Sequence, residues 1–222
     1  MPEITPEFLA LGVTLYVVLL FSLSVHESAH AWMALRMGDD TAAQAGRITL
    51  NPVAHIDPLG TLAIPLVQML WGGIPLLAWA RPTPVQPANF KPGWFRKGHL
   101  AVSAAGPLSN LVLALLFTAG FFVFCRLAAN PLAPGQPALH LLTTGIFMNV
   151  GLGLFNLLPL PPLDGAWLAS WGLPARLAEP YDRLVEPWGA TLLMLLVATG
   201  ALGRLTGPPI HFLSTSLLRL AI

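Results

Sequence analysis

Long apolar runs constrain the fold of this chain more than any other feature. The first spans about Phe8–Val25, and two more lie at about His99–Phe124 and Leu139–Leu158. An α-helix needs about 20 apolar residues to cross the hydrocarbon core of a bilayer. Only 9% of the 222 residues are charged, whereas a soluble domain usually carries about 25%. The sequence therefore predicts a membrane-embedded protein with little surface built to face water.

Helical segments are expected in six places. Regular helices are expected at about Phe8–Arg36, His99–Phe124, Leu139–Leu158 and Trp188–Leu202, and a weaker run at Ile210–Ile222 either crosses the membrane or lies on its surface. The sixth, Leu59–Trp79, is a poor straight helix because it contains Pro65, Gly72, Gly73 and Pro75. No stretch is large enough for a separate soluble domain, so residues 1–222 are predicted to form a single membrane-embedded domain.

The charged residues and the cysteine narrow the range of partners. The net charge is only +1, and no basic patch with interleaved aromatic residues indicates a nucleic-acid partner. The expected surroundings are the lipid bilayer. The single cysteine, Cys125, cannot form an intramolecular disulfide. Glu3 and Glu7 stand where a secretory signal carries Lys or Arg, so the first apolar run is expected to be a retained helix.

The pattern His26-Glu27-x-x-His30 is the clearest indication of chemistry. It places two imidazoles on one face of a helix, where one metal ion can bind both, and the adjacent Glu27 can hold an attacking water. Ionisable groups at the end of a membrane-spanning run are costly and usually functional. The alternative is a helix end that emerges among lipid headgroups. Phe8 to His26 is roughly 27 Å of helix, so depth alone leaves both interpretations open.

A catalytic zinc needs a third protein ligand and an open coordination position. The acids in or near apolar sequence are Asp57 and Asp164. Asp164 follows a proline-broken helix end, and irregular backbone at membrane depth is tolerated where it lines a cavity. Each aspartate also has an ordinary explanation as a turn residue, in Asp164-Gly165 and Asp57-Pro58 respectively. That explanation is the stronger one for Asp57.

The two candidate ligand groups can meet only if the segments that carry them run in the same direction. Both groups lie at the C-terminal ends of their segments, so an even number of crossings must separate them. A re-entrant Leu59–Trp79 segment leaves two crossings and brings the groups together. The basic residues between 81 and 97 then fall on the ligand side, which the positive-inside rule makes cytoplasmic.

Three stretches together resemble the site-2 protease family of intramembrane metalloproteases. They are His26-Glu27-Ser28-Ala29-His30, Gly106-Pro107-Leu108-Ser109-Asn110, and the stretch from Asn156 to Gly165 that ends Leu163-Asp164-Gly165. They occur in the order that the family shows and cover roughly residues 8–168, the expected catalytic core. The stretch from Gly46 to Gly60 is similar to a compact prokaryotic branch, and no PDZ-like module is inserted.

The resemblance implies one zinc ion per chain, bound by His26, His30 and Asp164, with Glu27 as general base. It also implies that Asn156 helps to hold the substrate or the oxyanion. Together with the topology, it gives the expected fold class, an all-α polytopic membrane protein. In this fold a helical bundle with one re-entrant segment surrounds a buried zinc site.

The implied function is that of an intramembrane zinc metalloprotease, which hydrolyses peptide bonds within or near transmembrane segments of membrane-protein substrates. Glu27 would take a proton from the attacking water and deliver it to the leaving amine. A substrate helix would have to unwind, because a helical peptide bond is shielded. The expected location is the cell membrane, as a multi-pass protein with its active site towards the cytoplasm.

Some alternatives stay open in the sequence. His55 is either a group beside the site that contacts substrate or an ordinary loop histidine. A metal transporter could use the same ionisable residues, but it would need polar residues through the other half of the bilayer, where the apolar runs supply almost none. A non-catalytic scaffold would not need Glu27 as a base. The protease is therefore the favoured interpretation.

Overall fold

The computed structural model describes residues 5–71, 78–128, 130–133 and 135–222. No strand occurs among these residues, so the predicted all-α class is confirmed. Three helices are long and apolar enough to cross a membrane, namely α1 (Pro6–Met37), α4 (Phe95–Leu127) and α5 (Pro137–Asn156). The pair α7 (Ala175–Ala198) and α8 (Ala201–Leu220), bent by 79°, would make a fourth span if taken together.

Local sequence signals set both ends of α1. The Thr5 hydroxyl accepts a hydrogen bond from the Phe8 N–H, and Pro6 occupies the first turn, as is typical of helix starts. At the other end Gly38 has a φ of 112°, in the left-handed region that favours glycine, and its N–H binds the last carbonyls of the helix. The helix therefore continues unbroken through the His26–His30 motif.

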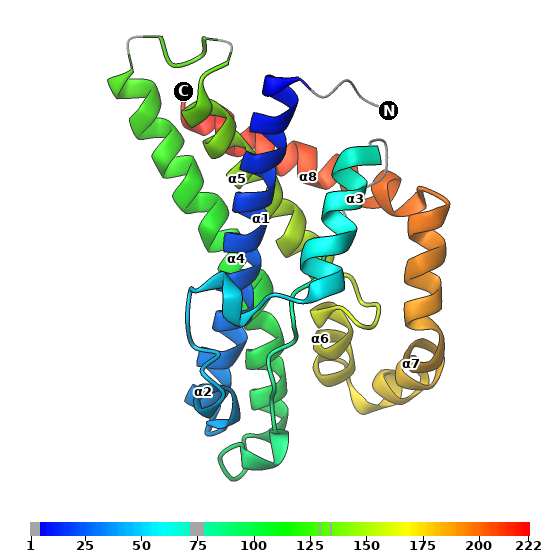
Figure 1. The fold of residues 1–222 in the computed structure, drawn as a ribbon. Helices are drawn as coiled ribbons and strands as arrows, with labels where there is room; N and C mark the ends of the chain where they lie inside the picture. The colour runs from blue at the N-terminus through cyan, green and yellow to red at the C-terminus, as the bar shows by residue number, and fades with distance from the viewer. Residues whose placement is uncertain (1–4, 72–77, 129, 134) are drawn as a thin grey trace.

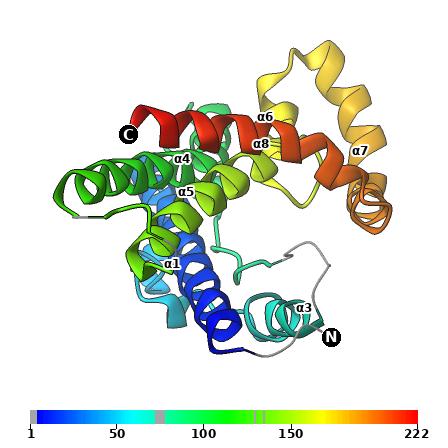
Figure 2. The same cartoon turned by 90° about the horizontal axis from the view of Figure 1, so that it is seen from above.

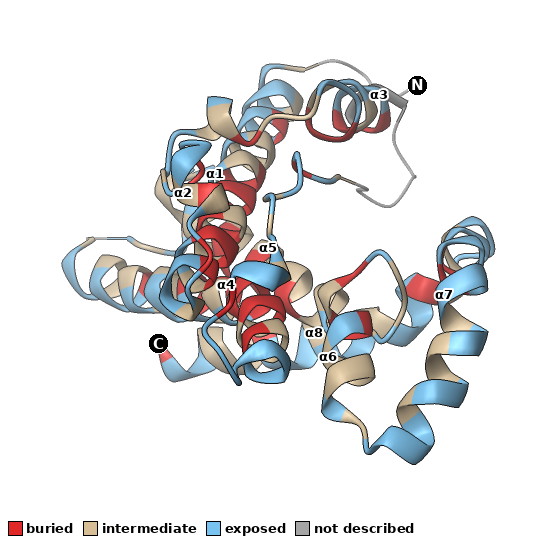
Figure 3. Ribbon diagram, turned by 90° about the horizontal axis from the view of Figure 1, so that it is seen from below, coloured by how far each residue is buried: buried red, intermediate tan, exposed pale blue. Residues whose placement is uncertain are grey.

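The three spanning helices pack into one unit. α4 packs against both α1 and α5, and α1 also contacts α5. Figure 1 shows α1 and α5 running in the same direction with α4 antiparallel to them, and Figure 2 shows the three helices clustered when seen from above. Buried residues gather between these helices, while large parts of α3 and α7 are exposed (Figure 3). Parallel α1 and α5 are the arrangement that the predicted pairing of the ligand groups requires.

The segment Leu59–Trp79 returns to the place where it begins, as the re-entrant prediction requires. It starts in a π-helical turn, Pro58–Ala63, and continues as α3 (Ile64–Trp71). Gly72, Gly73 and Pro75, which suggested a broken helix, lie outside the described residues. The Trp79 N–H then donates to the Gly60 carbonyl over 3.2 Å, and the Thr61 hydroxyl donates to the Trp79 carbonyl over 2.8 Å. Because its two ends bind each other, the segment does not span the bundle.

Short elements complete the chain. α2 (Thr41–Gln44) and a 3₁₀ turn at Pro52–Ala54 follow α1, another 3₁₀ turn lies at Pro87–Asn89, and α6 (Asp164–Gly172) follows α5. α6 packs against α4 and α7. These elements matter here because α6 begins with the candidate ligand Asp164.

The C-terminal helices differ from the sequence prediction. The boundaries Trp188–Leu202 and Ile210–Ile222 are wrong, because α7 begins at Ala175 and α8 begins at Ala201. The chain turns between these two helices at Gly200, whose φ is 70°. Hydropathy detects only the apolar half of α7, since its first half carries charged residues and is nevertheless helical. α8 runs across the axis of α1 and packs on α5 (Figure 1).

Candidate metal centre

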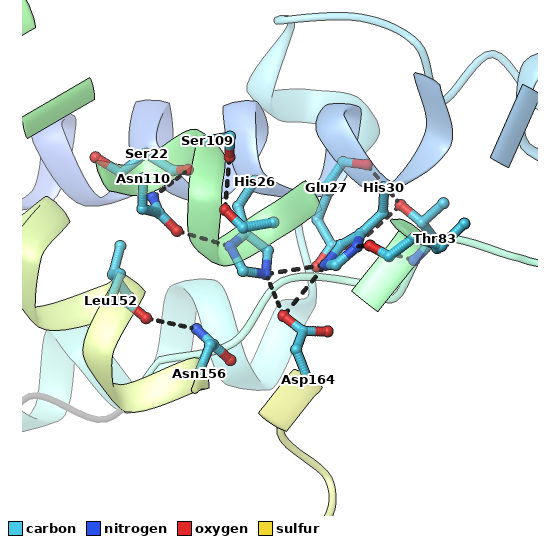
Figure 4. Close-up of polar contacts among 12 residues, drawn as sticks. Ser22, His26, Glu27, His30, Thr83, Ser109, Asn110, Leu152, Asn156 and Asp164 are labelled. Carbon is cyan, nitrogen blue, oxygen red and sulfur yellow. Dashed lines mark hydrogen bonds and ion pairs between the residues drawn. The ribbon is translucent and has the colours of Figure 1, made fainter. Parts of the chain in front are cut away.

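Three side chains from two distant parts of the chain, α1 and the start of α6, converge in one place (Figure 4). The Asp164 Oδ2 atom lies 3.1 Å from His26 Nε2 and 3.4 Å from His30 Nε2. The two Nε2 atoms are 3.1 Å apart. The structure thus brings together the three residues that the sequence analysis chose as metal ligands.

The helical spacing of α1 explains the position of the two histidines. Residues four apart lie on one face of a helix, and the two imidazoles meet edge to face with centroids 4.7 Å apart. Both side chains are buried. The face that carries them is directed at α4 and at the start of α6.

The chain between α5 and α6 delivers the carboxylate. α5 ends at Asn156, and Asp164 is the first residue of α6. A negative charge at this position interacts favourably with the dipole of the helix. Gly165 follows, and a side chain there would overlap the carbonyls of Leu157 and Leu158. Asp164 and Gly165 are thus the first two residues of a helix, and the absence of a side chain at Gly165 lets α6 begin close to the residues that follow α5.

The far end of α6 is anchored on α4. The Arg96 guanidinium donates to the carbonyls of Trp171 and Gly172, over 2.7 and 3.3 Å. The His99 ring stacks on the Trp171 indole with centroids 4.4 Å apart. Both ends of α6 are thus held, which fixes the position of Asp164 relative to α4.

Each imidazole is oriented through its other nitrogen. His26 Nδ1 lies 2.7 Å from Asn110 Oδ1, and His30 Nδ1 lies 2.7 Å from the Val102 carbonyl. Both partners are hydrogen-bond acceptors, so Nδ1 carries the proton and the Nε2 lone pair faces Asp164. Metal-binding histidines are usually held in this way. Asn110 thus forms a hydrogen bond between α4 and α1.

Gly106 leaves room for the ligand atoms. A methyl group at this position would overlap the Nε2 atoms of His26 and His30. Gly106 is buried in α4 and is followed by Pro107, inside the same helix. The absence of a side chain at Gly106 is therefore a requirement of the site and of close packing between α1 and α4.

The residues fit a zinc ion. The Asp164 Oδ2 atom is buried without a hydrogen-bond donor in the described structure, and such an atom is costly unless it binds something. The three ligand atoms lie within 4.8 Å of one another. Two imidazole nitrogens and one carboxylate oxygen form a typical ligand set of a catalytic zinc.

Glu27 lies beside the three candidate ligands and is held by Thr83. The Thr83 N–H donates to Glu27 Oε2 over 2.9 Å, and the Thr83 hydroxyl lies 2.8 Å from the same oxygen. Thr83 belongs to the extended chain that returns from the re-entrant segment. Sequence reasoning missed this residue. Its position between Pro82 and Pro84, which favours extended backbone, was the available signal.

Asp39 fastens that returning chain to the end of α1. Its buried carboxylate accepts hydrogen bonds from the Gln86 N–H over 2.6 Å and from the Asn89 amide over 3.0 Å. Burial opposes the charge, but these bonds and those from Thr41 hold the pKa of Asp39 below its ordinary value. The charged carboxylate thereby keeps the segment that carries Thr83 next to Glu27.

The other predicted residues have different surroundings. His55 is buried and its Nε2 lies 2.9 Å from the Thr49 carbonyl, beside Ser28. Asn156 is partly buried and its amide donates to the Leu152 carbonyl over 3.0 Å, near Asp164 in Figure 4. Substrate contact by His55 and Asn156 stays a prediction.

Asp57 has the turn role that the sequence favoured for it. Its Oδ1 atom accepts hydrogen bonds from the N–H groups of Leu59 and Gly60, over 3.0 and 2.7 Å. It therefore caps the π-helical turn at the start of the re-entrant segment. Its role at this turn leaves Asp164 as the acid that faces the histidines.

Comparisons with known proteins relate the chain to zinc metalloproteases. The family described as "Peptidase family M50" matches residues 127–199. The protein named "Putative zinc metalloprotease YwhC" from Bacillus subtilis (strain 168) is 39% identical over 193 residues, which is 83% of this chain and 80% of that protein. "Putative zinc metalloprotease Rip2" from Mycolicibacterium smegmatis is 32% identical over 193 residues, 83% of this chain and 66% of that protein. No solved structure is a significant match to the chain.

Proposed function

Because the chain belongs to peptidase family M50, the site-2 protease family of zinc metalloproteases, we propose that it cleaves membrane proteins within or near their transmembrane segments. The observation that carries this proposal is the convergence of His26, His30 and Asp164 at a buried position between apolar helices long enough to span a membrane. In this proposal the three residues bind the zinc of the family, and Glu27 acts as general base.

The depth of the centre favours a substrate that lies in the membrane. His30 is seven residues before the end of α1, or roughly 10 Å of helix. The helices around it expose apolar side chains, as membrane-facing helices do. A transmembrane substrate can approach such a centre sideways through the bilayer, whereas a soluble polypeptide would first have to leave water.

The catalytic roles follow from the positions of the side chains. When bound, zinc polarises a scissile carbonyl and makes a water molecule more acidic. Glu27 directly follows His26 in the sequence but is not one of the three clustered residues, so its carboxylate is available to accept and return a proton. The N–H and hydroxyl of Thr83 hold that carboxylate in one orientation. Asn156, the last residue of α5, is proposed to bind the substrate backbone.

Ligand replacement distinguishes the two candidate aspartates. Purified wild-type protein is expected to hold one zinc per chain, and Asp164→Ala should lower the zinc content strongly because the only carboxylate in the cluster is removed. Asp57→Ala should keep its zinc and lose about 1 kcal/mol of stability, since only a helix cap is lost. Metal analysis and thermal unfolding of both variants provide the measurement. Full zinc content in Asp164→Ala with loss in Asp57→Ala would contradict the proposed ligand set.

The proposed orientation places the centre towards the cytoplasm. The side that carries the end of α1 also carries Arg36, Lys91 and Lys97, and positive charge is enriched on cytoplasmic sides. In a Cys125→Ser background, Leu132→Cys in the α4–α5 connection should react with a membrane-impermeant thiol reagent added outside intact cells. Pro92→Cys should react only after permeabilisation. The reverse labelling pattern would contradict the orientation.

A cleavage assay tests the function itself. The zinc-loaded protein in detergent is expected to cut some members of a panel of single-span membrane peptides, with product masses that place the cut within or near the span. Removal of zinc by a chelator should stop cleavage, and added zinc should restore it. A metal transporter would instead move zinc into protein-containing vesicles and leave all peptides intact.

A further inference from the structure

A chain of buried hydrogen bonds leads from the metal centre into the middle of the bundle. It starts at His26 Nδ1, which contacts Asn110 Oδ1. The Asn110 amide nitrogen donates to Asn149 Oδ1 over 3.0 Å, and the Asn149 amide nitrogen donates to the Ser22 hydroxyl over 2.9 Å. Asn110, Asn149 and Ser22 each have a relative exposure of 0%. The chain joins α4, α5 and α1.

The two histidines differ in how firmly their protons are placed. His30 Nδ1 faces a backbone carbonyl, that of Val102, which can only accept a hydrogen bond. His26 Nδ1 faces a side-chain amide, which offers an oxygen in one orientation and an NH₂ group in the other. The protonation pattern of His26 therefore depends on what orients Asn110, and that of His30 does not.

A backbone carbonyl fixes the orientation of the Asn149 amide, and through it the orientation of the Asn110 amide. The Asn149 amide nitrogen also donates to the Gly145 carbonyl over 2.9 Å, and a carbonyl cannot act as a donor. Asn149 must therefore turn its oxygen to Asn110, and Asn110 must turn its nitrogen to Asn149 and its oxygen to His26. The Ser22 carbonyl also faces the Asn110 nitrogen, but at 3.4 Å it lies beyond the usual 2.7–3.2 Å range and holds the amide only weakly.

We propose that Asn149 is a positioning residue that sets which nitrogen of His26 carries the proton, by holding the amide of Asn110 in one orientation. This inference rests on the proposed function, in which His26 binds zinc through Nε2. Without Asn149, the Asn110 amide can rotate and present its NH₂ group to Nδ1. The proton of the neutral ring then moves to Nε2, where it blocks metal binding.

Zinc affinity of the purified protein is the direct test, measured by competition with a chromogenic chelator. Asn149→Leu, and the less bulky Asn149→Ala, are expected to weaken zinc binding about 10–100-fold, the usual effect of losing a group that supports a metal ligand. Ser22→Ala should bind zinc nearly as well as wild type, because the Gly145 carbonyl still orients Asn149. Thr143→Val on the same helix is the matched control, since its hydroxyl binds only carbonyls of its own helix.

A second substitution separates orientation from general packing. Asn110→Asp presents an oxygen to His26 in either orientation, because both carboxylate oxygens accept hydrogen bonds. In the Asn149→Leu background, Asn110→Asp should therefore restore zinc affinity to within a few-fold of wild type. In the wild-type background it should not improve affinity, because it sets a carboxylate oxygen against Asn149 Oδ1. A purely structural role of Asn149 would give no such restoration.

Failure of the proposed function and failure of the inference about Asn149 give different results. If wild type binds no zinc, the proposed function fails. If wild type binds zinc and both Asn149 variants bind it equally well, or Asn110→Asp restores nothing, the inference about Asn149 fails. Should the Asn149 variants not fold, ¹⁵N spectra of the histidine rings in zinc-free wild type decide. A neutral His26 ring protonated at Nδ1 supports the inference, and one protonated at Nε2 overturns it.

Discussion

Glu27→Gln is expected to lower peptide cleavage by roughly 10²–10⁴-fold, the usual contribution of general acid–base catalysis, while the zinc content stays at the wild-type level. Glutamine has the shape of glutamate, and its amide oxygen can still accept the Thr83 hydrogen bonds. It cannot take a proton from water. The three proposed ligands His26, His30 and Asp164 are unchanged, so the metal should remain bound.

This substitution needs a control with the same chemical change and a second readout. Glu179→Gln removes a carboxylate charge from an exposed ion pair with Arg183 and should leave both cleavage and zinc content unchanged. Glu27→Gln should also retain bound substrate during purification, because it binds without completing the reaction. Equal cleavage rates in wild type and Glu27→Gln would show that Glu27 is not the base.

Gly106→Ala is expected to remove zinc binding and activity, although a single methyl group is all that is added. The new methyl group would occupy the space of the two imidazole Nε2 atoms, so the histidines or the whole of α4 must move. Misplacement of reacting groups by about 1 Å can reduce rates about 10²-fold. Alanine favours helix formation over glycine by about 1 kcal/mol, so an unfavourable effect would have to come from this overlap.

Gly151→Ala on α5 is the matched control for that substitution. A methyl group there would lie 3.8 Å from Ile210, which is ordinary van der Waals contact. It should keep zinc and activity and gain the same helix propensity. Measurement of zinc content, cleavage and thermal stability for both variants completes the test. Wild-type zinc affinity in Gly106→Ala would mean that the close approach of α4 to the histidines is not required.

Much of the metal centre could be predicted because short sequence patterns mark its residues. The spacing of His26 and His30 is a helical repeat, and the prolines before Asp164 break the helix at the point where a carboxylate is presented. The broken helix end and the family resemblance favoured Asp164 over Asp57, and its pairing with the histidines needed one non-local argument, an even number of membrane crossings. That argument agrees with parallel α1 and α5 and with a re-entrant segment whose ends bind each other.

Other features could not be predicted from the sequence because they depend on contacts between distant segments. Thr83 reaches Glu27 across 56 positions of the chain. The prolines on either side of it indicate an extended backbone but do not indicate this contact. Asn149 is one of several polar residues in the apolar run Leu139–Leu158. Its hydrogen bond to Asn110 depends on the packing of α5 against α4. The boundaries of α7 and α8 were wrong because helices continue through polar and proline-containing sequence that hydropathy assigns to loops.

The separation of the ligands along the chain has a consequence for biogenesis. His30 and Asp164 are 134 positions apart, as 164 minus 30 gives. At synthesis rates of about 5–20 residues per second, Asp164 is made roughly 7–27 seconds after His30. During that interval α1 enters the bilayer with both histidines but no carboxylate partner. The proposed three-ligand centre is therefore incomplete in the nascent chain until α5 and the start of α6 have been made.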